Sequence, residues 1–283
     1  MPGGIRSSAV AGAAALAALL AGCGGGSGGG DNTAVALTEW LPVGAPGYTA
    51  VDLAALREDL GGEEDLDPFS APLGSNLLGA ASLATDGLRD SAGAPASREL
   101  LRILRFGEAT SIAESRDSES PVTAIATSAD TGEIGSDLGD AGYRDRGGIL
   151  VRGGDPAVLL EIGIVFVSPD PAALRGIPDE PADEPPDPLL EELEGPFVAT
   201  TLGQDCVRSQ GASGEADGSG EVGLLIDGDA DAGRVRAAGS PRIELGEPEA
   251  DGDVVTLAVE GPEDGAGFAA FDALSDGAVT YDC

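Results

Sequence analysis

The chain contains no histidine and no lysine, and all 15 of its basic residues are arginine. Without histidine, the usual general base of serine and cysteine hydrolases and the commonest transition-metal ligand are missing. Without lysine, Schiff-base chemistry and the lysine of phosphate-binding loops are excluded as well. Aromatic residues are also few, with one Trp, three Tyr and six Phe. We therefore expect a protein that is not an enzyme and has no cofactor; a hydrolase working through paired carboxylates is the remaining enzymatic alternative.

Acidic residues outnumber basic ones by 50 to 15, which gives a formal net charge of −35. A field of this sign repels nucleic acid and anionic lipid headgroups, so we expect no nucleic-acid partner. The acids are spread along the chain, and this composition resembles that of proteins from salt-adapted actinobacteria. The alternative interpretation is an acidic surface built for a cationic ligand.

The first 22 residues have the layout of a secretory signal. Arg6 supplies a positive charge, residues 9–21 form an apolar run, and small residues lead to Cys23. The run of 13 residues is shorter than the roughly 20 that span a bilayer as a helix. The stretch Leu20-Ala21-Gly22-Cys23 resembles the lipobox of bacterial lipoproteins, which implies cleavage before Cys23 and a lipid on its thiol.

Residues 23–36 begin with a glycine-rich stretch that suits a flexible tether. We therefore expect the mature protein to be attached to a membrane through the lipid on Cys23, on the extracytoplasmic face. The alternative is an ordinary secretory signal in which Cys23 occurs by chance.

Cys206 and Cys283 are the two cysteines that remain. In an oxidising exterior compartment two such cysteines usually pair, so we predict a disulfide between them. A free or metal-bound thiol pair is the alternative, although the missing histidine leaves no usual zinc set.

The sequence predicts an α+β fold in three parts. Residues 37–120 are expected to be mostly helix and loop, with helices starting near Asp52 and over residues 97–106. Residues 121–195 and 196–283 are each expected to form an α+β unit of short strands and helices. The predicted elements of the first unit are strands at residues 122–127, 148–152 and 163–168 and helices at residues 133–141 and 170–176.

The two units share a pattern. The stretch 122–131 matches 222–231, and 164–176 matches 254–271, each as a strand, an acidic turn and a helical stretch. We interpret them as duplicated, tandem ferredoxin-like units, with the common rhythm of α+β proteins as the alternative.

Parts of this region resemble a loose group of actinobacterial cell-envelope lipoproteins of unknown function. The matching stretches are Ala141-Gly142-Tyr143, residues 147–151 and residues 167–175. The resemblance implies a fold type and carries no activity with it.

Two charged clusters are candidate sites. Asp227, Asp229 and Asp231 alternate as in a calcium-binding loop, but Ala232 and Ala238 stand where that loop needs glycine and glutamate. The alternatives are a weak calcium site and a solvated turn whose acids favour the start of a helix. Arg98, Arg102 and Arg105 line one face of a predicted helix, where they either bind an anion or pair with nearby acids.

These observations predict a membrane-anchored binding or envelope-organising module with an unidentified protein or small-molecule partner. A solute-binding lipoprotein of a transporter is the alternative, and it would need a deep cleft between the two units.

Overall fold

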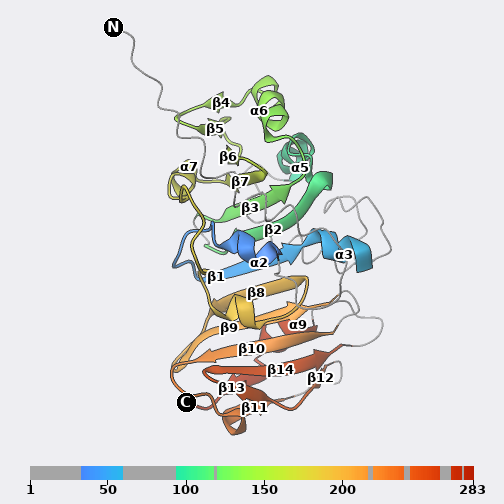
Figure 1. The fold of residues 1–283 in the computed structure, drawn as a ribbon, viewed down its shortest axis with the longest axis vertical. Coiled ribbons are helices and arrows are strands. Elements are labelled where there is room, and N and C mark those ends of the chain that lie inside the picture. Colours follow the sequence, from blue (N-terminus) through green and yellow to red (C-terminus); the bar gives the residue numbers. More distant parts are fainter. Residues whose placement is uncertain are drawn as a thin grey trace.

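The computed structural model describes residues 33–59, 94–117, 120–215, 219–238, 243–261, 269–275 and 277–283. Their main feature is one 13-stranded sheet in which every pair of neighbouring strands is antiparallel. The sheet runs along the length of the molecule, from β4 at one end to β12 at the other (Figure 1). The structure thus confirms the α+β class.

The sheet consists of two halves that meet at the pair β1 and β8. The strands of the first half are β1 (Gly47–Asp52), β2 (Ala109–Ser115), β3 (Val122–Thr127), β4 (Arg144–Asp145), β5 (Ile149–Val151), β6 (Ala157–Glu161) and β7 (Ile164–Ser168). Those of the second are β8 (Phe197–Leu202), β9 (Val207–Gly214), β10 (Gly220–Ile226), β12 (Glu244–Leu245), β13 (Glu249–Asp251) and β14 (Val254–Glu260). β11 (Val235–Ala237) and β15 (Val279–Tyr281) form a separate two-stranded sheet.

The two halves repeat one strand order. Counting outward from the centre, β1-β2-β3-β7 corresponds to β8-β9-β10-β14. Between β3 and β7 the chain forms β4, β5 and β6, and between β10 and β14 it forms β11, β12 and β13. A helix follows β7, and another helix follows β14. The internal duplication remains a prediction, which this shared order supports.

The ferredoxin-like arrangement is not confirmed. In that motif the two strands joined through a helix are separated by another strand. Here β3 and β5, the two strands that the predicted helix of the first unit connects, have two strands between them, β7 and β6. The predicted boundaries do not divide the sheet. Residue 121 directly precedes β3, which pairs with β2, and residue 196 directly precedes β8, which pairs with β1, so hydrogen bonds join all three predicted parts.

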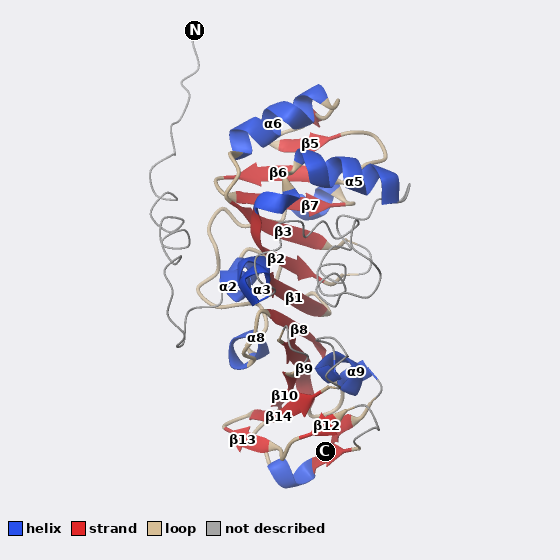
Figure 2. Cartoon of the chain, turned by 90° about the vertical axis from the view of Figure 1, so that its right-hand side faces the viewer, coloured by secondary structure: helices blue, strands red, loops and turns tan. Residues whose placement is uncertain are grey.

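Helices cover both faces of the sheet. The helices are α2 (Thr33–Thr38), α3 (Leu53–Asp59), α5 (Ala94–Ile103), α6 (Thr131–Asp140), α7 (Pro171–Leu174), α8 (Leu189–Glu192) and α9 (Ala269–Ser275), with 3-10 turns η2 (Phe106–Glu108) and η3 (Ala232–Arg234). Apolar residues of α3, α5 and α6 share one core, and those of α2, α7 and α8 share another. Figure 2 shows α5 and α9 on one side of the sheet and α2 and α8 on the other. None of the helices described is long and apolar enough to cross a membrane.

Because both faces are covered, the central strands are buried along consecutive residues instead of alternately. Every residue of β7 is buried, and so are the first five residues of β1. Residues 37–120, expected to be mostly helix and loop, also supply β1 and β2, two strands of the sheet's centre that the sequence did not predict.

The predicted tether is also too long. Helix α2 begins at Thr33, and its residues Ala34 and Val35 are buried in the core that α2 shares with α7 and α8. Residues 33–36 consequently belong to the folded domain. Residues 23–32 lie outside the described residues.

Several local predictions are confirmed. β3 has the predicted bounds, and the helix expected at residues 133–141 is α6. The side chain of Asp52 accepts a hydrogen bond from the Ala55 amide at the start of α3, at 2.9 Å. Asp170 caps α7 in the same way through the Ala172 amide at 2.8 Å. Short polar side chains before a helix thus marked its start, as their capping chemistry requires.

Candidate binding pocket

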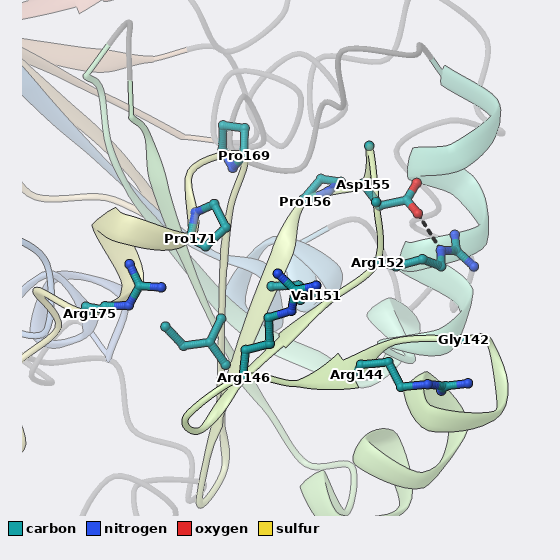
Figure 3. Close-up of a pocket in the computed structure, with 13 residues that line it drawn as sticks. Gly142, Arg144, Arg146, Val151, Arg152, Asp155, Pro156, Pro169, Pro171 and Arg175 are labelled. Carbon is teal, nitrogen blue, oxygen red and sulfur yellow. Dashed lines mark hydrogen bonds and ion pairs between the residues drawn. The ribbon is translucent and has the colours of Figure 1, made fainter.

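A pocket with a volume of about 520 Å³ lies in the first half of the molecule, beside the β4–β5 hairpin. Its walls come from this hairpin, from the turn between β5 and β6, and from the connection of β7 to α7 (Figure 3). The volume falls within the roughly 300–1,000 Å³ of small-molecule sites. Four of the 15 arginines of the chain line it: Arg144, Arg146, Arg152 and Arg175.

A glycine turn shapes the wall that the β4–β5 hairpin forms. The β4–β5 turn contains Gly147 and Gly148, which have φ angles of +73° and +90°. A residue with a side chain would be strained in this conformation. The amide of Gly148 donates to the carboxylate of Asp145 at 2.8 Å, which closes the turn. The glycines of this turn therefore place Arg144 and Arg146 on a tight hairpin that lines the pocket.

Arg152 is held rigidly at one side of the pocket. Its guanidinium bonds to the carboxylate of Asp155 and, at 2.9 Å, to that of Glu99 on α5. It also lies 5.0 Å from the centre of the Tyr143 ring and donates to the Ala141 carbonyl at 3.0 Å. The hydrogen bond to Asp155 is the main reason why the pKa of Arg152 is raised. This arginine is thus a fixed, already compensated charge.

The other three arginines are exposed. Arg144 donates to the carbonyls of Tyr143 at 2.8 Å and Gly139 at 3.2 Å, and therefore leans toward the end of α6. Arg146 and Arg175 make no ion pair or side-chain hydrogen bond with any residue that the structure describes. In Figure 3, Arg146 projects from the hairpin and Arg175 from the end of α7. Their guanidinium groups remain available to a ligand.

The pocket is a local exception to the charge of the chain. Its lining carries four guanidinium groups and one carboxylate, Asp155, within a chain of net charge −35. Its apolar wall consists of Ile149, Val151, Pro156, Pro169 and Pro171. Positive charge beside an apolar wall suits an anion that carries an organic part.

Sequence reasoning missed this pocket, although a signal was present. Three arginines fall within the nine residues 144–152 of a chain that has only 15. This spacing identifies a cationic segment, but it does not reveal that Arg175 joins it from α7.

A second, smaller pocket of about 270 Å³ lies in the other half and is acidic. Its lining includes Glu194, Glu215, Glu221 and Glu260. Burial, with a smaller contribution from the carboxylates of Glu194 and Glu249, raises the pKa of Glu221. The pocket carries four carboxylates and no arginine, so it is the electrostatic opposite of the arginine pocket.

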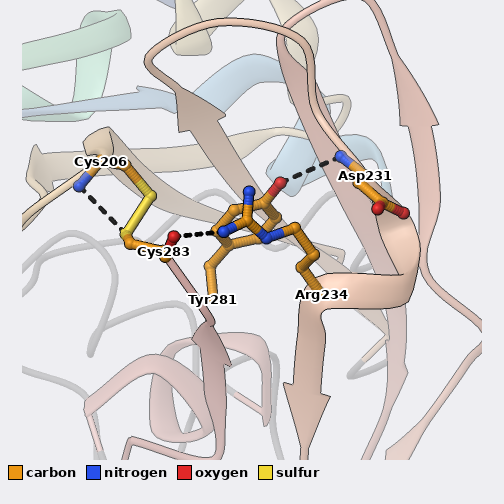
Figure 4. The surroundings of a disulfide bond; sticks show 5 residues. All are labelled: Cys206, Asp231, Arg234, Tyr281 and Cys283. Carbon is orange, nitrogen blue, oxygen red and sulfur yellow. Dashed lines mark hydrogen bonds between the residues drawn. A yellow bond between two sulfur atoms is a disulfide. The ribbon is translucent and has the colours of Figure 1, made fainter.

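The predicted disulfide is present. Cys206 and Cys283 are bonded, with a Cα–Cα distance of 5.7 Å. Figure 4 shows the C-terminal residue held from two sides: by Cys206 and by Arg234, whose guanidinium donates to the Cys283 carbonyl. Arg234 also lies over the Tyr281 ring at 5.4 Å. The disulfide therefore attaches Cys283 to the loop between β8 and β9.

The structure does not gather the three candidate calcium ligands. Among the described residues no group of three or more Asp, Glu, Cys or His side chains could hold a metal ion. Asp231 instead caps η3, accepting a hydrogen bond from the Gly233 amide at 2.9 Å. Asp227 and Asp229 lie in the turn before it. Of the two interpretations, the geometry matches the turn whose acids stabilise a helix start.

The remaining candidates have mixed outcomes. Cys23 lies outside the described residues. In the arginine stripe, Arg105 pairs with Glu133 at 2.7 Å and with Asp137 at 3.4 Å, as expected of a solvated face. Arg102 is exposed, and the side chain of Arg98 is not described.

Comparisons with known proteins identify no family for this chain. No protein-family model matches the chain, and no curated protein does. Among solved structures, crystal form I of TP0453 aligns with a TM-score of 0.45 and 8% identity, covering 86% of this chain and 97% of that one. Crystal form IV of TP0453 aligns with a TM-score of 0.45 and 9% identity over 84% and 95% of the two chains.

Proposed function

We propose that this protein is a lipid-anchored, extracytoplasmic module that binds a small anionic ligand in the arginine pocket without catalysis. The observation that carries the proposal is the gathering of four of the 15 arginines around one pocket of a strongly acidic chain. Arginine forks bind carboxylate and phosphate groups bidentately, which makes them the usual means of anion recognition.

Two further features support the extracytoplasmic part of the proposal. The stretch Leu20-Ala21-Gly22-Cys23 has the lipobox pattern, and the Cys206–Cys283 disulfide fits an oxidising compartment. A solute-binding protein with a cleft between two units is less well supported, because the arginine pocket lies within the first half.

The anchor is tested by mass spectrometry of the N-terminus of the purified mature protein. We expect a chain that begins at Cys23 and carries the added mass of a lipid. Fractionation should find the protein with membranes and Cys23→Ser released or misprocessed. An unmodified N-terminus at any other residue would refute the anchor.

Ligand binding is tested separately by a panel of small anions, comprising carboxylates, sulfonates and phosphates. Thermal unfolding is followed at constant ionic strength for the wild type and for Arg146→Gln/Arg175→Gln. An anion that raises the Tm of the wild type and leaves the variant unchanged supports the proposal. A panel with no such anion refutes it.

A further inference from the structure

We propose that the arginine pocket selects a compact dianion, the phosphate monoester of a small organic alcohol. This inference rests on the proposed function and names the ligand class of the same pocket. It follows from three properties of the pocket: which arginines are available, how the charge around them is distributed, and what the remaining wall is made of.

The first property is that Arg146 and Arg175 line the same pocket and form no ion pair with a described residue. Among the described side chains, Arg105, Arg208 and Arg236 have acidic partners, at 2.7, 3.1 and 2.6 Å. Arg152 is the fourth arginine with an ion pair, whereas Arg146 and Arg175, like Arg102 and Arg116, form none with a described residue. Two arginines that lack one and line the same pocket are suited to meet the charge of a ligand.

The second property is the geometry of these two groups. Arg146 comes from the β4–β5 hairpin and Arg175 from the end of α7, so their forks approach from different elements (Figure 3). A planar carboxylate fits one fork and carries one charge. A phosphate monoester carries nearly two charges at neutral pH and three acceptor oxygens in a tetrahedral arrangement. Its oxygens can therefore accept hydrogen bonds from guanidinium groups that come from different directions.

The third property is the size of the positive region. At physiological ionic strength charges are screened beyond roughly 8 Å, so a small ligand in the pocket experiences mainly its arginines. An extended polyanion would also contact the acidic surface outside and be repelled. The proposed ligand is accordingly compact, which agrees with the expectation that the protein does not bind nucleic acid.

The pocket volume of about 520 Å³ also exceeds what a phosphate group needs. The wall of Ile149, Val151, Pro169 and Pro171 offers apolar contact for an organic part. Such a monoester occurs as a free metabolite or as a lipid headgroup, and the two sources share the chemistry that Arg146 and Arg175 recognise.

The test is isothermal titration calorimetry of the purified full chain with glycerol 3-phosphate at pH 7.5 and constant ionic strength. We expect saturable binding that Arg146→Gln or Arg175→Gln weakens by about tenfold or more, the effect of losing one charge-assisted hydrogen bond. Both arginines are exposed, so the variants should keep the wild-type Tm. The control Arg208→Gln/Arg236→Gln removes two charges from the second half and should leave affinity within about twofold, because long-range charge effects are screened.

The charge state of the ligand gives a second readout. A phosphate monoester takes up a proton near pH 6, so its affinity should fall between pH 7.5 and pH 5 while arginine stays charged. Vesicles of phosphatidic acid, compared with phosphatidylcholine, distinguish the two sources. Arginine-dependent binding to phosphatidic acid alone assigns a lipid headgroup, and arginine-dependent binding of glycerol 3-phosphate assigns a free metabolite.

Binding of neither probe overturns the inference, as does an equal loss of affinity in the control variant. If succinate binds with the same dependence on Arg146 and Arg175 while glycerol 3-phosphate does not, the phosphate class is wrong but the anion-binding function stands. If the whole anion panel fails, the function itself is wrong.

Discussion

Gly211 of β9 is the cross-strand partner of Gly223 of β10, and the side chain of Leu193 lies against both. A Cβ on Gly211 would come within 2.8 Å of Leu193 Cδ1 and 2.9 Å of the Ala199 carbonyl oxygen. The two glycines therefore form a flat region of the sheet on which the segment after α8 packs. At Gly211 both the backbone and a leucine approach closely, whereas at Gly223 only leucine side chains do; close approach is a common reason for glycine inside a strand.

We predict that Gly211→Ala destabilises the protein by about 1–3 kcal/mol, the usual effect of overpacking a core. The backbone oxygen of Ala199 cannot move aside as a flexible side chain can. Denaturant unfolding of the wild type and the variant measures the difference.

Gly139→Ala is the matched control. Gly139 lies in α6, and a Cβ there would meet nothing within 4 Å. Alanine is a better helix former than glycine, so this variant should be equally stable or up to about 1 kcal/mol more stable. Equal effects of the two substitutions would contradict the close approach at Gly211.

Local chemistry explains which elements the sequence could predict. Asp52 and Asp170 mark helix starts because an acid before a helix caps its free amides, and the apolar run of β3 marks a strand. Strand pairing is different, because β1 pairs with β8 through residues about 150 positions apart, such as Tyr48 and Thr200. No local pattern encodes that contact.

The same distinction applies to the sites. The Cys206–Cys283 pair was predictable because only two cysteines follow Cys23, in a chain whose first residues predict export. The arginine pocket was not, because Arg175 joins Arg146 only when α7 packs beside β5 and β6. Composition identified an acidic chain, but it does not reveal a pocket lined by four arginines.

We predict that thiol titration of the unfolded, unreduced mature protein finds no free thiol. A lipid blocks Cys23 under the proposed anchor, and the disulfide blocks the other two cysteines. One reactive thiol would point to an unmodified Cys23, and three to the absence of both modifications.

We also predict that Cys206→Ser/Cys283→Ser lowers the free energy of unfolding by roughly 4 kcal/mol, the chain-entropy effect of opening a loop of this length. The sequence separation is 77 residues. Denaturant unfolding of the oxidised wild type and the variant measures the loss. Equal stability would show that the disulfide does not restrict the unfolded chain.

A fourth prediction concerns pH. Burial raises the pKa of Glu39, Glu161 and Glu221 above the usual value of 4.5, and neighbouring carboxylates add to each shift. A carboxyl whose pKa is higher in the folded state binds a proton on folding. Ionising these groups therefore destabilises the protein at neutral pH, and the penalty is relieved as pH falls through the raised pKa values. Stability at constant ionic strength should rise from pH 7 toward pH 5.

The test variant is Glu39→Gln/Glu161→Gln/Glu221→Gln, which should be more stable than the wild type at pH 7. Each group is partly exposed, so each substitution should contribute less than about 1 kcal/mol. The exposed Glu192→Gln serves as the control for general loss of negative charge. A triple variant that keeps the full wild-type pH dependence would show that other groups cause it.

The last prediction concerns salt. Residues 1–22 contain Arg6 and no acid, so the proposed cleavage before Cys23 would leave 50 acidic and 14 basic residues and a charge of −36. The ion pairs of the described residues use Arg105, Arg152, Arg208 and Arg236, which leaves most carboxylates without a cationic partner. These carboxylates repel one another over a Debye length of roughly 30 Å at 0.01 M salt, but of only roughly 3 Å at 1 M.

The Tm should therefore rise steadily with sodium or potassium chloride, because screening needs no particular ion. Calcium at constant ionic strength should add nothing beyond this, since Asp231 already caps η3 and the described acids form no metal-binding group. A sharp rise in Tm with millimolar calcium would instead reveal a specific site. A Tm that stays flat between roughly 0.05 M and 1 M salt, where screening changes severalfold, would contradict the self-repulsion argument. In that case helix starts such as those at Asp130 and Asp170 would have to stabilise much of the negative charge locally.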